Sequence, residues 1–251
     1  MTGASFGIGA ATARAYAAAG ASLVLNGRDE KRLQAVADSI SAAHPSIQVA
    51  TLAGDVGKEE THAALVELAL QRFGALHIVF NNAGIFPMAT LQAATAQQVD
   101  SLLDTNVKSI IYGLKHQLPA IAKSASKDSW GVIVNNSSSI STSVRSGFEA
   151  MGLYAMSKSA VDTLSKFGAL EGAPLHVRVL AINIGTAGSD GALTAFGGAE
   201  GFETLSKGLA LVQPALSVEE VAQTVLFLSD NKKARFITGS TFLVDGGVNI
   251  K

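Results

Sequence analysis

The chain has 251 residues, enough for one sizeable α/β domain or two small ones. Its 19 basic and 20 acidic side chains give a formal charge of −1, so no broad basic field is available for nucleic acid or an anionic membrane. The absence of cysteine excludes disulfides and zinc–thiolate sites, and the five scattered histidines form no metal-ligand pair at helical spacing. Since no apolar run reaches about 18 residues, we expect a cytoplasmic protein that acts on a small molecule and holds no metal.

Short aliphatic or β-branched runs alternate with longer, alanine-rich stretches, a pattern typical of repeated βα units. The expected strands are 22–26, 47–52, 77–81, 131–136, 176–182 and 241–244. The expected helices are 10–19, 30–43, 58–73, 96–121, 154–171 and 218–229. The strand runs are continuously apolar, as in parallel strands that helices cover on both faces. Right-handed crossovers then predict an α/β fold with a doubly wound parallel sheet.

No linker, charge run or internal repeat divides the chain, so we expect a single domain over 1–251. The longest stretch without clear periodicity, 186–214, is rich in glycine and alanine. A loop of this length inside one domain is more often functional than structural, and we predict a substrate lid there.

A glycine-rich turn, 2–9, opens directly into the first expected helix. Gly3, Gly7 and Gly9 lie where backbone N–H groups at a helix start approach a diphosphate. Their spacing differs from the common dinucleotide fingerprint, and a tight turn without a ligand would use similar glycines. After the next strand, Arg28 stands where dinucleotide folds usually carry an acidic ribose ligand. A guanidinium prefers a 2′-phosphate and so predicts NADP, unless Arg28 only begins a solvated turn.

Tyr154 and Lys158 are four residues apart and therefore share one helical face. A nearby ammonium favours the phenolate and lowers the pKa of the tyrosine toward a range useful for proton transfer. The spacing alone also arises by chance, so its meaning depends on the motifs around it.

Those motifs follow one another in a fixed order. They are the glycine turn, Asp55-Val56, Asn81-Asn82-Ala83-Gly84, Asn106, a serine after the 131–136 strand, Tyr154-x-x-x-Lys158 and Val244-Asp245-Gly246-Gly247. Over nearly the whole chain this series resembles the short-chain dehydrogenase/reductase (SDR) family. The resemblance implies a Rossmann fold and an NADP-dependent oxidoreductase that moves a hydride between the nicotinamide and a carbonyl or secondary alcohol.

The resemblance also implies roles for single residues. Tyr154 would be the general acid or base, and Lys158 would hold the nicotinamide ribose and lower the pKa of the tyrosine. Asn106 would distort its helix and hold a water molecule, while Ser138 would polarise the substrate carbonyl. The implied cofactor-binding residues are Gly3, Ser5, Gly7, Ile8, Gly9, Arg28, Asp55, Val56, Asn82, Ala83, Gly84, Tyr154, Lys158, Ala187 and Ser189.

The serine could instead be Ser141, which has the usual spacing to Tyr154, whereas Ser138 lies three residues further away than usual. We prefer Ser138 because the end of a strand fixes its position, while the following loop can absorb an insertion. Two other positions depart from the family pattern. Ile184 replaces a usual proline, and Phe6 stands where some NADP-preferring relatives have a basic residue, which leaves Arg28 nearly alone toward the phosphate.

The central first strand of this fold is missing before the glycine turn. We expect about six to eight further N-terminal residues in the natural product, because their absence would leave ladder hydrogen bonds unpaired in the middle of the sheet. Family members are commonly homodimers or homotetramers joined through the long helices, here 96–121 and 154–171.

Apolar residues in the 186–214 loop favour a lipophilic or aromatic substrate, although they would equally cap the edge of the domain. They are Phe196, Phe202, Leu205, Leu209 and Leu211. The alternative function is a catalytically inactive nucleotide-binding sensor or scaffold on the same fold.

Overall fold

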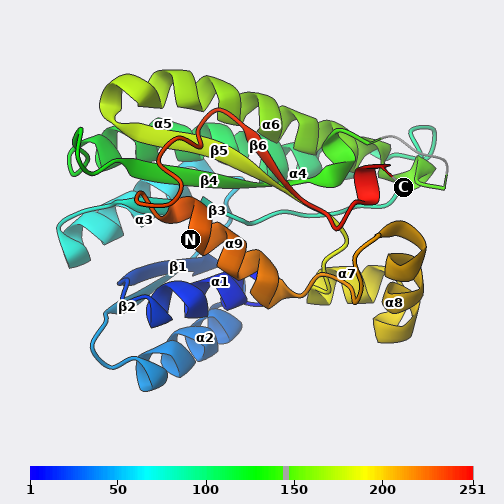
Figure 1. Ribbon diagram of the computed structural model, residues 1–251, viewed down its shortest axis with the longest axis horizontal. Coiled ribbons are helices and arrows are strands. Elements are labelled where there is room, and N and C mark those ends of the chain that lie inside the picture. The colour runs from blue at the N-terminus through cyan, green and yellow to red at the C-terminus, as the bar shows by residue number, and fades with distance from the viewer. Residues whose placement is uncertain (144–146, 251) are drawn as a thin grey trace.

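The computed structural model describes residues 1–143 and 147–250, which form parallel strands with helices on both faces (Figure 1). The strands are β1 Leu23–Gly27, β2 Val49–Ala53, β3 Ile78–Asn81, β4 Gly131–Ser138, β5 Val177–Ile184 and β6 Thr241–Val244. The helices are α1 Gly7–Ala18, α2 Glu30–Ala43, α3 Glu59–Phe73, α4 Ala96–Leu102, α5 Ser109–Ala122, α6 Gly152–Gly172, α7 Asp190–Ala195, α8 Gly198–Leu209 and α9 Val218–Ser229. All six expected strands and five of the six expected helices are present, with ends shifted by a few residues, while the helix expected over 96–121 is divided.

The strands form two parallel sheets, β1-β2 and β3-β4-β5-β6. The dipeptide Met1–Thr2 lies between them. Asn26 N–H donates to the carbonyl of Met1 at 2.9 Å, and Thr2 N–H donates to the carbonyl of Phe80 at 3.2 Å. These bonds join β1 and β3 at their carboxyl ends, so the two sheets together form the predicted Rossmann-like α/β fold.

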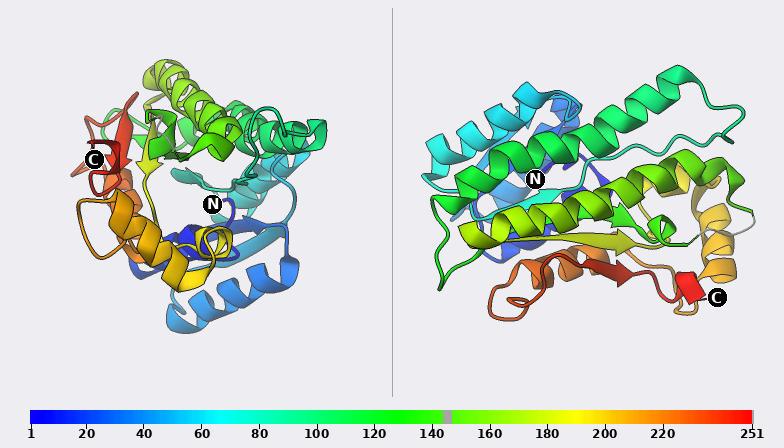
Figure 2. Two further views of the ribbon diagram at one scale, coloured as in Figure 1. Left: turned by 90° about the vertical axis from the view of Figure 1, so that its right-hand side faces the viewer. Right: turned by 90° about the horizontal axis from the view of Figure 1, so that it is seen from above.

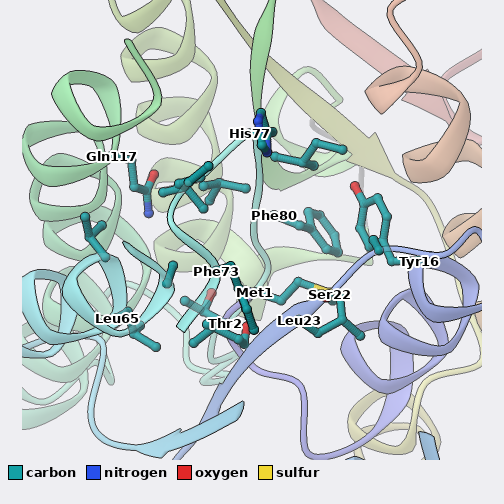
Figure 3. A pocket seen from close by; sticks show the side chains of 18 of the residues that line it. Met1, Thr2, Tyr16, Ser22, Leu23, Leu65, Phe73, His77, Phe80 and Gln117 are labelled. Carbon is teal, nitrogen blue, oxygen red and sulfur yellow. The ribbon is translucent and has the colours of Figure 1, made fainter. Parts of the chain in front are cut away.

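A cavity of about 360 Å³ continues the gap between β1 and β3 beyond Met1 (Figure 3). Its walls are mainly apolar side chains of β1, α3 and β3, among them Leu23, Leu65 and Phe80. The Met1 ammonium donates to the carbonyl of Val24 at 2.7 Å, and burial lowers its pKa to about 5. The space between β1 and β3 is thus hollow beyond Met1.

Two groups of helices cover the sheets, and each encloses a core (Figures 1 and 2). Helices α1, α2 and α9 pack on one side, where Leu25, Leu33 and Leu180 are fully buried. Helices α3, α5 and α6 pack on the other, over Ile121 and Ile133. No helix in residues 1–143 and 147–250 is long and apolar enough to cross a membrane.

Two expected elements differ in the structure. The helix expected over 96–121 divides into α4 and α5, joined by the π-helical turn Leu103–Lys108. The stretch 186–214 is not an extended loop, because it contains α7 and α8. Its glycines hide this helicity from sequence reasoning, since glycine disfavours helix interiors.

Candidate active site

The carboxyl ends of β3, β4 and β5 and the start of α1 open into one cavity of about 710 Å³. In parallel α/β sheets, ligands bind at this end of the strands. The predicted site residues that line the cavity are Gly3, Gly7, Ile8, Arg28, Asn82, Ala83, Gly84, Ser138, Tyr154, Lys158, Ala187 and Ser189. Residues separated by most of the chain length are therefore brought to a single site.

The glycine turn forms one end of the cavity. Gly3 and Gly7 have φ angles of 63° and 55°, which glycine adopts without strain. A Cβ on Gly9 would lie 2.0 Å from the carbonyl oxygen of Gly3, so a side chain there would break the turn. Asn82 braces the turn through side-chain N–H groups donated to the carbonyls of Thr2 and Gly3. The turn is thus held open against the start of α1, where a helix N-terminus favours an anion.

Two guanidinium groups, not one, line this end. Arg28 follows β1, and Arg32 lies one turn later in α2. Arg32 pairs with Asp29 at 3.5 Å, and both side chains are exposed. Sequence reasoning missed Arg32, which follows Arg28 by four residues and carries the same charge.

Tyr154 lies at the opposite end of the cavity, near the start of α6. Burial raises the pKa of its phenol to about 12, and a hydrogen bond with Ser138 opposes part of that rise. The Ser138 hydroxyl also donates to the carbonyl of Ile184 at 3.3 Å. The strand ends of β4 and β5 therefore fix this serine beside the phenol.

Lys158 is 3 % exposed, and its ammonium donates to the carbonyl of Asn136 at 2.7 Å. It lies 5.5 Å from the centre of the Tyr154 ring. Burial lowers the pKa of Lys158 to about 8, and the carboxylate of Asp162 opposes this shift. Burial raises the pKa of Tyr154 in this structure, and the expectation that Lys158 lowers it stays a prediction.

Asn106 lies in the π-helical turn, which agrees with the expected distortion of its helix. Its side-chain oxygen accepts from Ile85 N–H at 2.8 Å. Its amide donates to the carbonyl of Ile85 at 2.9 Å and to the Ser157 hydroxyl at 3.1 Å. The side chain therefore braces the segment after β3 against α6, and the water-holding role stays a prediction.

Four predicted cofactor residues do not line the cavity: Ser5, Gly9, Asp55 and Val56. Gly9 shapes the glycine turn instead, because a side chain at this position would collide with the carbonyl of Gly3. The Asp55 carboxylate accepts from Gly57 N–H at 2.9 Å, and Val56 is buried with its carbonyl against His62. Their binding roles remain predictions.

The Ser141 hydroxyl is hydrogen-bonded to residues other than Tyr154. Its hydroxyl donates to the carboxylate of Asp162 at 2.5 Å and accepts from the Asn183 amide at 2.8 Å. Ser138, in contrast, contacts the phenol of Tyr154. The geometry thus favours Ser138 as the substrate-orienting serine.

Aromatic rings surround Tyr154 on the substrate side. Phe86 packs edge-on against the tyrosine ring at 4.7 Å between centroids, and Phe196, next to α7, lies 6.2 Å from Phe86. Apolar side chains of α8 complete the wall; they are Phe202, Leu205 and Leu209. Sequence reasoning did not predict Phe86 as a site residue. The one feature that could have indicated it is its position two residues after Gly84. The described residues contain no cluster of histidine or carboxylate side chains suited to a metal ion.

A parallel α/β sheet with a glycine turn at one end of its cavity and a Tyr–Lys–Ser group at the other defines a dinucleotide-dependent oxidoreductase. Residues 3–249 match the family model described as enoyl-(acyl carrier protein) reductase. With this match over nearly its whole length, the chain belongs to the short-chain dehydrogenase/reductase family, as predicted.

Relatives named for an enzymatic activity are similar over nearly their full length. An A-factor type gamma-butyrolactone 1'-reductase of Streptomyces virginiae is 33 % identical, with 100 % of this chain and 94 % of the relative covered. A cyclohexanol dehydrogenase of Acinetobacter is 32 % identical, with 100 % and 94 % covered. The crystal structure of L-sorbose reductase from Gluconobacter frateurii, complexed with NADPH and L-sorbose, aligns with a TM-score of 0.91 at 27 % identity, over 100 % of this chain and 95 % of that one.

Proposed function

We propose that this SDR oxidoreductase uses NADP(H) to interconvert a carbonyl and a secondary alcohol, with Tyr154 as the general acid or base. One observation carries the proposal. The Tyr154 phenol, hydrogen-bonded with Ser138, shares a single cavity with the buried Lys158 ammonium and the glycine turn. A nucleotide-binding sensor would not require this acid beside its ligand, so the geometry favours an enzyme.

In the reduction direction, three side chains of the cavity have separate roles. The Ser138 hydroxyl turns its proton from the carbonyl of Ile184 to the substrate carbonyl oxygen, and Tyr154 transfers its phenolic proton to that oxygen as negative charge develops there. Lys158 holds positive charge beside the phenol and would bind the ribose hydroxyls of the cofactor. The bound nicotinamide supplies or accepts the hydride. Lys158 is buried and Tyr154 is partly buried, which limits the access of water to the proton-transfer path.

The residues present fit the phosphorylated cofactor. Gly3 and Gly7 place no side chain at the start of α1, and the nearby cavity wall carries Arg28 and Arg32. Two guanidinium groups attract a 2′-phosphate, whereas a carboxylate at this position would repel it. The NADPH-bound state of the aligned sorbose reductase also supports this assignment.

We propose a neutral, apolar substrate with an alicyclic or aromatic ring next to the reacting carbon. Phe86, Phe196 and the α8 side chains form the wall beyond Tyr154, and the cavity's arginines lie at the opposite, nucleotide end. A ring stacks favourably against such a wall, while a charged substrate would lose its hydration there. The similarity to a cyclohexanol dehydrogenase supports the same class.

A carbonyl panel tests the proposal. Oxidation of NADPH, followed by its nicotinamide absorbance, is measured with cyclic ketones, aryl ketones, keto acids and sugars. We expect turnover with cyclic or aryl ketones and at least tenfold lower kcat/KM for keto acids. NADPH binding without turnover of any carbonyl or alcohol would favour the sensor instead.

We also propose assembly into a homodimer or homotetramer through α5 and α6. Large apolar side chains on these helices are exposed in the single chain; they are Ile111, Met156, Phe167 and Leu170. Exposed apolar patches of this kind mark protein interfaces. The cytoplasmic location expected from the sequence stays a prediction.

A further inference from the structure

Asp162 is a buried carboxylate in α6, one helical turn after Lys158, and is 6 % exposed. One of its oxygens accepts from the Ser141 hydroxyl at 2.5 Å and from the Asn183 amide at 3.1 Å. A carboxylate is costly to bury unless it is paired or hydrogen-bonded. Helix α6, the short 3-10 turn that contains Ser141, and strand β5 therefore meet at this single charge.

Both partners of the carboxylate come from segments that hold Ser138. Ser141 ends the short 3-10 turn that begins directly after Ser138, and Asn183 precedes Ile184, whose carbonyl accepts from Ser138. A further bond, from the Ser159 hydroxyl to the carbonyl of Ser141, joins the same turn to α6. The carboxylate thus ties α6 to the ends of β4 and β5, where the predicted catalytic serine lies.

Asp162 is also the charged group that acts on the buried Lys158 ammonium. Charged side chains on the neighbouring elements have other partners. Lys108 pairs with Asp104, and Lys115 pairs with Glu59. The guanidinium of Arg178, toward the opposite end of β5, donates to Asn231 and to backbone carbonyls. An ammonium in a dry site loses its proton more readily unless an opposite charge lies nearby.

We propose that Asp162 is a positioning residue for the reaction, acting through Lys158 as its counter-charge and through Ser141 and Asn183 as the anchor of the turn after Ser138. The inference rests on the proposed reductase function, because it assigns Asp162 to the same proton-transfer group. It predicts that the charge of Asp162, and not only its hydrogen bonds, sets the pH range in which the site works.

The test is D162N, which keeps the shape of the side chain and removes its charge. The pKa of Lys158 is about 8 with the carboxylate present, so loss of the carboxylate lowers it further. We expect the fall of kcat/KM with rising pH to begin about one pH unit lower, while activity near pH 6 stays within about tenfold of wild type. The pH dependence of NADPH affinity, measured by fluorescence without turnover, should move in the same direction.

Two further variants make the result specific. S141A removes one donor but keeps the carboxylate, so its pH midpoint should match that of wild type. D162S removes the charge and leaves room for water, and it replaces D162N if the asparagine variant does not fold. A wild-type midpoint in either folded Asp162 variant overturns the inference, even if kcat is lower at every pH. Absence of turnover in the wild-type chain contradicts the proposed function instead, and the NADPH-affinity profile then decides on Asp162.

Discussion

Ser138 and Ser141 lie three residues apart, yet their hydroxyls serve different partners. Ser138 contacts the Tyr154 phenol, whereas Ser141 is bound to Asp162 and Asn183. Ser138→Ala should lower kcat about a hundredfold, because it removes the hydrogen bond to the substrate oxygen. Ser141→Ala should retain activity within about tenfold. Steady-state kinetics on the best ketone checks this pair, and the opposite order of effects would assign the catalytic role to Ser141.

We predict that Arg28 and Arg32 together decide the choice of cofactor. Each guanidinium is solvent-exposed, but both line the nucleotide end of the cavity. Hydrogen bonds to charged groups contribute about 1.5–3 kcal/mol each, so Arg28→Gln or Arg32→Gln should weaken NADPH binding at least tenfold. NADH binding should change little, since it has no 2′-phosphate. Fluorescence titrations at two salt concentrations measure both cofactors, and an equal loss for NADH would contradict phosphate recognition.

At the scale of elements, sequence periodicity predicted the strands and helices of the sheet because each buries a continuous apolar face. Periodicity alone could not predict the π-helical turn at Asn106, because Ile85, which holds this side chain, lies 21 residues earlier; only the family resemblance implied a distortion there. Helix α8 was missed because of its glycines, although Phe202, Leu205 and Leu209 have helical spacing.

The same reasoning applies to the site. The Tyr154–Lys158 pair and the glycine turn could be predicted from the sequence, because each is defined by short spacings and by its place in the order of motifs. The roles of Phe86 and Asp162 could not be predicted, because they depend on contacts between segments that are distant in the sequence.

Helix α8 offers a direct test of the predicted substrate lid. A Cβ on Gly201 would lie 2.0 Å from the carbonyl oxygen of Phe196, so Gly201→Ala must displace the helix from the Phe196 segment. We expect KM for the ketone to rise roughly tenfold while NADPH affinity is unchanged, because α8 lines only the substrate end.

Gly208→Ala in the same helix is the matched control. A Cβ there meets nothing within 4 Å, and alanine favours the helix by up to ~1 kcal/mol. This variant should keep the wild-type KM and a melting temperature equal to or above that of wild type. Equal effects of the two substitutions on KM would show that α8 packing does not shape the site.

At the scale of the whole molecule, the hollow centre of the sheet predicts a pH-dependent stability. In a chain that begins at Met1, the folded state lowers the pKa of the Met1 ammonium from 8.0 to about 5. Between these values the unfolded chain binds more protons than the folded one, so the stability contributed by this group rises with pH and is lost as pH falls toward 5. The effect amounts to ~4 kcal/mol at most.

Urea unfolding at several pH values between 5 and 8 measures this slope. The control is the same chain extended before Met1 by a short apolar segment, which replaces the ammonium with a neutral amide. His62, whose pKa burial also lowers, remains in both chains and contributes a slope of the same sign. The extended chain should show a weaker pH dependence, and identical slopes would contradict burial of the terminal ammonium.

The central claim is that Tyr154 transfers the proton inside a cofactor-binding site that its removal leaves intact. Tyr154→Phe deletes only the phenolic oxygen and keeps the ring that packs against Phe86. We expect kcat for the best ketone to fall about a thousandfold, while the dissociation constant for NADPH stays within about threefold of wild type. Both quantities are measured on the same preparation, by NADPH absorbance and by fluorescence titration. A near-normal kcat in this variant would contradict the account.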